Sequence, residues 1–62
     1  MLRKDLVGQP FILFKDGRNR EVKVIKLRKD RITVQYVKAF DCKEEILNIY
    51  DFAKLAGIKI ED

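Results

Sequence analysis

Two short turn signals divide the first half of this chain into apolar segments and so limit the folds open to it. Asp16-Gly17 and Lys29-Asp30 each stand between runs of strand-forming residues. Gly17 tolerates the positive φ that a two-residue hairpin turn needs. Parallel strands need crossover connections of about a dozen or more residues, and the connections here are too short for that. The sequence therefore predicts an antiparallel sheet built from hairpins.

The segments on either side of these turns have the composition and alternation of strands. Residues 10–14 are dense in strand formers, and residues 31–38 alternate apolar with polar positions. Side chains two positions apart lie on the same face of a strand. Ile32, Val34 and Tyr36 are therefore predicted to share one face, directed toward the core.

The segment between the two turns contains an irregularity. Val22 and Val24 share one parity, whereas Ile25 and Leu27 share the other. A strand with a period of two cannot change faces without a cause. We therefore predict a β-bulge or a sharp coil between Val24 and Ile25, which would turn all four side chains toward the interior.

The C-terminal third predicts a fourth strand, one helical turn and a closing strand. Residues 46–50 form another apolar run, and Asp51 is a residue type that caps helix N-termini. A single helical turn over residues 52–56 would then stop at Gly57, which suits a left-handed C-cap. Residues 58–61 alternate again, as a short strand does.

These segments together predict an all-β fold, a small five-stranded antiparallel Src-homology-3-like barrel with one short helical turn before the last strand. Closure into a barrel would also remove exposed strand edges. The 62 residues make one domain, with a lead-in at 1–9 and the barrel at 10–61. An alternative interpretation makes residues 43–56 one helix and gives an α+β fold.

Four successive stretches carry a resemblance to a known class of small barrels. They are Lys-Leu-Arg-Lys-Asp at 26–30, Arg-Ile-Thr-Val-Gln-Tyr-Val at 31–37, Glu-Glu-Ile-Leu-Asn-Ile-Tyr at 44–50 and Asp-Phe-Ala-Lys-Leu at 51–55. Their order resembles the Src-homology-3-like barrels of the Tudor and chromo-barrel type and, as a second choice, the Sm and Hfq barrels. The resemblance implies a module that binds, often to nucleic acid or to a peptide, rather than an enzyme.

Positive charge is concentrated in the first part of the chain. The net charge is +4, but residues 1–38 carry eleven Lys or Arg against four Asp or Glu, which is +7, and residues 39–62 carry −3. If the apolar side chains of the middle hairpin point inward, the cationic ones point outward beside Thr33 and Gln35. These outward cations are Lys23, Lys26, Arg28 and Arg31.

Such a row of cations predicts nucleic acid, DNA or RNA, as the partner, because contacts with phosphates release counterions and supply most non-specific affinity. Lys15 and Arg18 are predicted to assist it. Two alternatives stay open. The cations can simply keep the outer face solvated and the edges unpaired, or the chain can be a protein-interaction or self-assembling module that uses residues 11–14.

The aromatic residues offer additional contacts. Residues 11–14 cannot all be buried on one side of a sheet, so either one Phe is exposed or the lead-in covers it. The candidates for contact with a ligand are Phe14, Tyr36 and Phe40. Four rings also permit an alternative, a cation-binding cage built from Tyr36, Phe40, Tyr50 and Phe52.

Catalysis is disfavoured by what the composition lacks. There is no His to act as a general base, and Cys42 is the only cysteine, so neither an activated nucleophile nor a zinc site is expected. The three glycines are too scattered to form a phosphate-binding loop. We therefore expect no enzyme activity, no cofactor and no metal. A lone cysteine and the absence of a long apolar run predict a cytoplasmic protein that does not enter the membrane.

Overall fold

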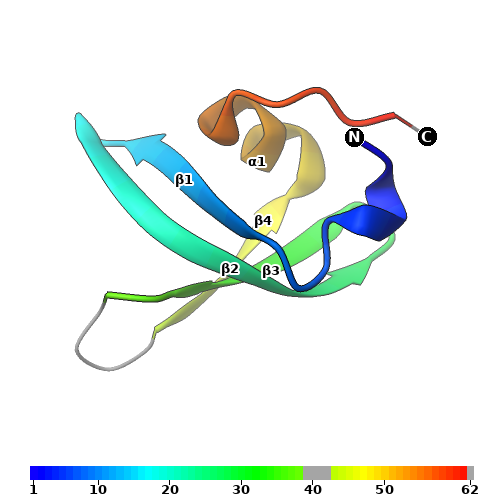
Figure 1. Cartoon of the computed structure of the whole chain (residues 1–62), viewed down its shortest axis with the longest axis horizontal. Helices are drawn as coiled ribbons and strands as arrows, with labels where there is room; N and C mark the ends of the chain where they lie inside the picture. The colour runs from blue at the N-terminus through cyan, green and yellow to red at the C-terminus, as the bar shows by residue number, and fades with distance from the viewer. Residues whose placement is uncertain (39–42, 62) are drawn as a thin grey trace.

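Four antiparallel strands and one helix make up the fold, in a computed structural model that describes residues 1–38 and 43–61. A short 3-10 helix, η1, precedes them at Arg3–Asp5. The sheet order is β1-β2-β3-β4, the order of the sequence. The strands are β1 at Pro10–Lys15, β2 at Arg18–Arg28, β3 at Arg31–Tyr36 and β4 at Glu44–Asn48, and the helix α1 spans Ile49–Ala56 (Figure 1).

Both predicted hairpin turns are confirmed. Asp16 and Gly17 have φ values of 55° and 74°, the pair of positive angles that a type I′ turn requires. Lys29 also has a positive φ, 51°, at the turn between β2 and β3. That conformation is uncommon for a residue with a long side chain.

The predicted bulge in β2 is confirmed as well. Val24 pairs with Val34, but the next pair joins Lys26 to Thr33, so Ile25 is the extra residue. The inward placement predicted for Ile25 is wrong, since 37% of its surface is exposed. A bulged residue lies outside the regular ladder, so it leaves the face that its neighbours share.

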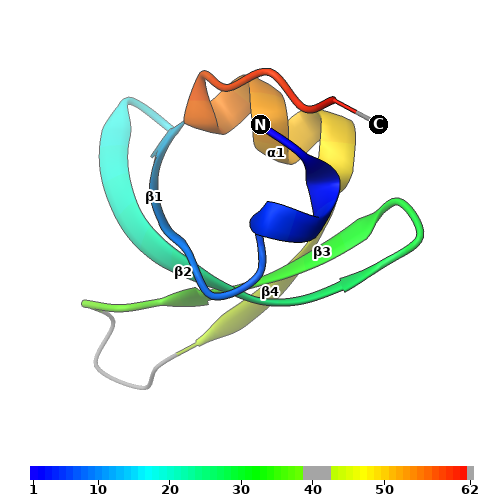
Figure 2. The same ribbon diagram turned by 45° about the vertical axis from the view of Figure 1, so that its right-hand side comes forward.

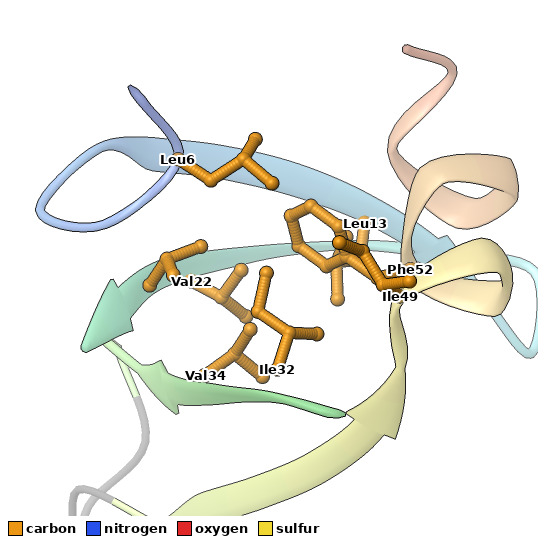
Figure 3. Close-up of a cluster of buried hydrophobic side chains, with 8 residues drawn as sticks. Leu6, Leu13, Val22, Ile32, Val34, Ile49 and Phe52 are labelled. Atoms are coloured by element: carbon orange, nitrogen blue, oxygen red, sulfur yellow. The ribbon is translucent and has the colours of Figure 1, made fainter. Parts of the chain in front are cut away.

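The sheet is strongly curled, and its concave face holds the core (Figures 1 and 2). Leu6 directly follows η1, and its side chain is buried in the core. α1 lies over the concave face and contributes Ile49 and Phe52 to the same core. Phe52 packs edge-on against Phe11, with ring centroids 5.2 Å apart. The fully buried side chains, shown in Figure 3, are Leu6, Leu13, Val22, Val24, Ile32, Val34, Ile49 and Phe52.

α1 differs from the predicted helical turn over residues 52–56 in its length and in its N-cap residue. It begins at Ile49, and its N-cap is Asn48, whose Oδ1 accepts a hydrogen bond of 2.8 Å from the backbone N–H of Tyr50. Asp51 is thus a first-turn residue and not the cap. Gly57, with φ 68°, ends the helix as predicted. The strand formers after Asn48 enter the helix because this register buries an apolar stripe of α1 against the sheet.

The predicted fifth strand is absent: residues 58–60 belong to no strand, and the described sheet stays open with four strands. Ile58 and Ile60 instead pack partly buried against the core. The chain then passes beside the N-terminus, where Leu2 and Glu61 form an isolated parallel bridge. α1, which packs against both edge strands, β1 and β4, directly precedes these residues. The alternative helix over residues 43–56 is also wrong, since β4 occupies its first part.

Candidate nucleic-acid interface

The four predicted outward cations lie together on the convex face of the sheet. The register of β2 and β3 pairs Lys23 with Gln35, Lys26 with Thr33 and Arg28 with Arg31. Paired residues of antiparallel strands point to the same side, and these pairs alternate with the buried pairs of the core. All four side chains are exposed. We call Lys23, Lys26, Arg28 and Arg31 the basic strip.

The basic strip has no carboxylate partner within the part of the chain that the structure describes. The ion pairs there use other cations, namely Arg3 with Asp30 at 3.2 Å and Lys38 with Glu21 at 3.4 Å, together with a pair formed by Lys15. The described acidic residues of the C-terminal part, residues 43–61, therefore form no ion pair with the basic strip. The charges of the basic strip are therefore available to an external anion.

The tip of the second hairpin concentrates this charge in a way that costs stability. Arg28 and Arg31 stand directly opposite each other across β2 and β3, and opposed like charges destabilise a sheet. Lys29, between them, is held in the left-handed region, which costs roughly 1–2 kcal/mol for a residue other than glycine. A bound anion would relieve the repulsion between the two guanidinium groups.

Two segments from elsewhere in the chain hold this hairpin tip in place. Nη1 of Arg3 donates to the backbone oxygen of Lys29 at 2.8 Å and to Oδ1 of Asp30 at 3.2 Å. The backbone N–H of Ile49, the first residue of α1, donates to the oxygen of Asp30 at 2.7 Å. The end of the basic strip is therefore positioned by both η1 and α1.

Sequence reasoning missed three cations near this tip, Arg3, Lys4 and Lys29. Lys29 and Lys4 both line a shallow pocket of about 620 Å³ beside Leu2 and Leu27. Lys29 is visible in the sequence as a cation inside the tight turn, next to two strip residues. The proximity of Lys4 is not visible there, because it depends on η1 folding back against the hairpin.

The structure does not bring Lys15 and Arg18 to the basic strip. They pair with each other across the first hairpin, on the concave side and at the opposite end of β2. Nζ of Lys15 lies 3.1 Å from Oε1 of Glu45, which belongs to the other edge strand. This ion pair joins β1 to β4 across the opening of the curled sheet, so Lys15 has a structural partner.

Tyr36 completes this contact on the concave side. Its hydroxyl donates to Oε1 of Glu45 at 2.9 Å, and the guanidinium of Arg20 lies 5.9 Å from its ring centre. The hydrogen bond to Glu45 raises the pKa of Lys15. Burial, followed by the hydrogen bond to Glu45, raises the pKa of Tyr36. Burial would raise the pKa of Glu45, but the hydrogen bonds from Tyr36 and Lys15 outweigh it and lower that pKa.

Glu45→Gln should therefore destabilise the protein by about 1 kcal/mol at neutral pH, because it removes a half-buried charge-assisted contact. Since the pKa of Glu45 is lowered by folding, its contribution is present above the ordinary value of 4.5 and is lost as the pH falls through the lower folded value. Urea unfolding at neutral pH and at successively lower pH checks this: the difference between variant and wild type should shrink as the pH falls below 4.5. Glu44→Gln, an exposed neighbour, should change little at any of these pH values.

The predicted aromatic contacts do not gather around the basic strip. Phe14 is 59% exposed on the convex face, but it pairs with Asn19 at the far end of β2. Tyr36 faces the concave side, as described above. Phe40, like Asp41 and Cys42, lies outside the residues that the structure describes. Phe52 is a core residue, which removes it from the cation-binding cage.

Other kinds of site find no support in residues 1–38 and 43–61. No group of three or more potential metal-ligating side chains occurs there. No helix in those residues is long and apolar enough to cross a lipid bilayer. Comparison of the chain with family models, with curated proteins and with solved structures finds no match.

Proposed function

We propose that this protein is a non-catalytic module that binds nucleic acid through the basic strip. The observation that carries the proposal is the exposure of Lys23, Lys26, Arg28 and Arg31 on one face without carboxylate partners among the described residues. Four such cations can contact about four phosphates and release the counterions condensed on them.

The neighbours of the basic strip suit this role. Thr33 and Asn48 share its face and offer neutral hydrogen-bonding groups, which proteins commonly direct at phosphate and sugar oxygens. The resemblance to Tudor and chromo-barrel modules, and to Sm and Hfq barrels, also favours binding over catalysis. We interpret the fold as an open form of such a barrel, in which the four-stranded sheet curls without closing and α1 covers its concave face.

The salt dependence of binding tests the proposal. With four phosphate contacts, the affinity for DNA or RNA should fall about 150-fold between 50 and 200 mM salt, a logarithmic slope of about −3.6. Fluorescence anisotropy with labelled oligonucleotides measures this directly. Undetectable binding at roughly 50 mM salt, or an affinity that does not depend on salt, would rule out the proposed function.

Arg31→Glu should separate binding from stability. The substitution removes the repulsion between Arg28 and Arg31 and creates an opposite-charge pair, so the free energy of unfolding should rise by about 0.5–1 kcal/mol. Nucleic-acid binding should weaken at the same time. Lys23→Glu is the control, because it removes a strip charge without relieving an opposed pair. Urea unfolding and anisotropy are the measurements, and a loss of stability in Arg31→Glu would contradict the account of the hairpin tip.

A second candidate function is self-assembly or protein binding through β1. Ile12 and Phe14 are 60% and 59% exposed on the convex side of this edge strand, so an apolar surface is available to a partner. Sedimentation equilibrium across a range of concentrations tests self-assembly. Association that Phe14→Ser abolishes would favour this function, and a monomer at all concentrations would count against self-assembly.

A further inference from the structure

We propose that the ligand of the basic strip is a nucleic-acid duplex, gripped through its phosphate backbone, rather than a single strand. This inference rests on the proposed function and deepens it. The juxtaposition that carries it is a row of four cations on a convex face whose described neighbours include no aromatic ring.

Residues that pair across β2, β3 and β4 form rows on the convex face, and these rows show which side chains lie beside each cation. Lys26 shares its row with Thr33 and Ile46, and Arg28 shares its row with Arg31 and Asn48. Lys23 shares its row with Gln35 and Glu44. Proteins that bind single strands without sequence preference stack successive bases on aromatic side chains, which supply roughly 1–3 kcal/mol per base. The described rows of the basic strip offer cations, neutral polar groups, the carboxylate of Glu44 and the apolar side chain of Ile46, but no aromatic ring on which a base could stack.

The exposed rings of the described residues lie away from these rows. Phe14 pairs with Asn19, which is four residues before Lys23 on β2, or about 13 Å along the strand. Tyr50 is 63% exposed, but it belongs to α1, which packs on the concave side of the sheet. A single nucleic-acid strand bound along the basic strip could not stack successive bases on these two rings.

The shape and spacing of the basic strip fit the outside of a duplex. The sheet bends away from the face that carries Lys23 and Lys26, so these two cations lie on a convex surface (Figure 2). Arg28 and Arg31 line an open pocket of about 810 Å³ at the hairpin tip, and no aromatic ring lines it. Lys26 and Arg28 are two residues apart on one strand, about 6.6 Å, which is close to twice the rise of about 3.4 Å per base pair of a duplex. A duplex also presents more charge per unit length than a single strand, so the same cations release more counterions from it.

The test compares a short duplex with its separated strands, both as DNA and as RNA, with concentrations expressed per phosphate. With four contacts, the expected logarithmic salt slopes are about −3.6 for a duplex and about −2.8 for a single strand. If the two affinities converge near about 1 M salt, the duplex should bind about tenfold more tightly at roughly 50 mM. Phe14→Ala and Tyr50→Ala should leave duplex affinity unchanged, and Lys26→Glu with Arg28→Glu should weaken it about 100-fold or more.

The outcomes distinguish this inference from the proposed function. Tighter binding of either duplex, with no effect of the ring variants, supports the inference. Single strands that bind as tightly as the duplexes, through the same lysine and arginine, would overturn it while leaving the proposed function in place. A several-fold loss of affinity in Phe14→Ala or Tyr50→Ala would also overturn it. Failure of both forms to bind would overturn the proposed function and the inference with it.

Discussion

Reversing two charges of the basic strip, as in Lys26→Glu combined with Arg28→Glu, should weaken nucleic-acid binding about 100-fold or more at roughly 50 mM salt. Each lost phosphate contact removes one released counterion from the binding equilibrium. The logarithmic salt slope should therefore fall from about −3.6 to about −1.8, since two of four contacts are gone. Anisotropy titrations of both proteins over the same salt series measure affinity and slope together.

The matched control is Lys54→Glu combined with Lys59→Glu. It changes the net charge by the same amount, and both lysines are exposed. Lys54 lies on α1 and Lys59 follows it, on the side of the sheet away from the basic strip. This control should lose only the small affinity that follows from net charge. If the two double variants lose affinity equally, the net charge and not the basic strip governs binding, and the site is wrongly assigned.

Phe52→Ala is expected to leave the chain unfolded at room temperature. Phe52 is fully buried, packs against Phe11 and joins α1 to the sheet. Truncating a buried Phe costs about 3–5 kcal/mol. A single core of this size supplies little more than about 3–5 kcal/mol in total. Far-UV circular dichroism and urea titration should therefore show no cooperative transition in the variant.

Two further variants separate the effect of the cavity that Phe52→Ala leaves in the core from other effects of a substitution in α1. Tyr50→Ala removes a large ring from the same helix, but that side chain is 63% exposed, so its effect should stay within about 0.5 kcal/mol. Phe52→Leu retains most of the apolar volume and should fold with a loss of about 1–1.5 kcal/mol. A cooperative transition in Phe52→Ala close to that of the wild type would show that α1 is not needed to complete the core.

Local features of the sequence predicted the central meander well. The Asp-Gly step and the alternation in residues 31–38 depend on φ preferences and on a period of two, both of which act between near neighbours. The parity change after Val24 predicted the bulge for the same reason. The outward direction of Lys26 and Arg28 followed from this pattern, although their role as a binding site stays a prediction.

The errors concern contacts between segments far apart in the chain. Asn48 rather than Asp51 caps the helix, because the position of α1 against β1 and β4 decides where the helix begins. Residues 58–60 have the alternation of a strand, yet they pack beside α1 without a strand partner. Lys15 was predicted to assist the basic strip, but the curl of the sheet brings it to Glu45 on the opposite edge strand.

The amino-acid sequence alone thus determined the hairpins, the bulge and the face on which the basic strip lies, because turn chemistry and strand periodicity are properties of neighbouring residues. Only the tertiary structure decided which cations keep a carboxylate partner, as Lys15 does, and which remain exposed without one among the described residues, as Lys26 does. That distinction depends on how far the sheet curls and on where α1 and the N-terminal segment pack. Both are set by the burial of apolar side chains such as Leu6 and Phe52, which meet only when the whole chain has folded.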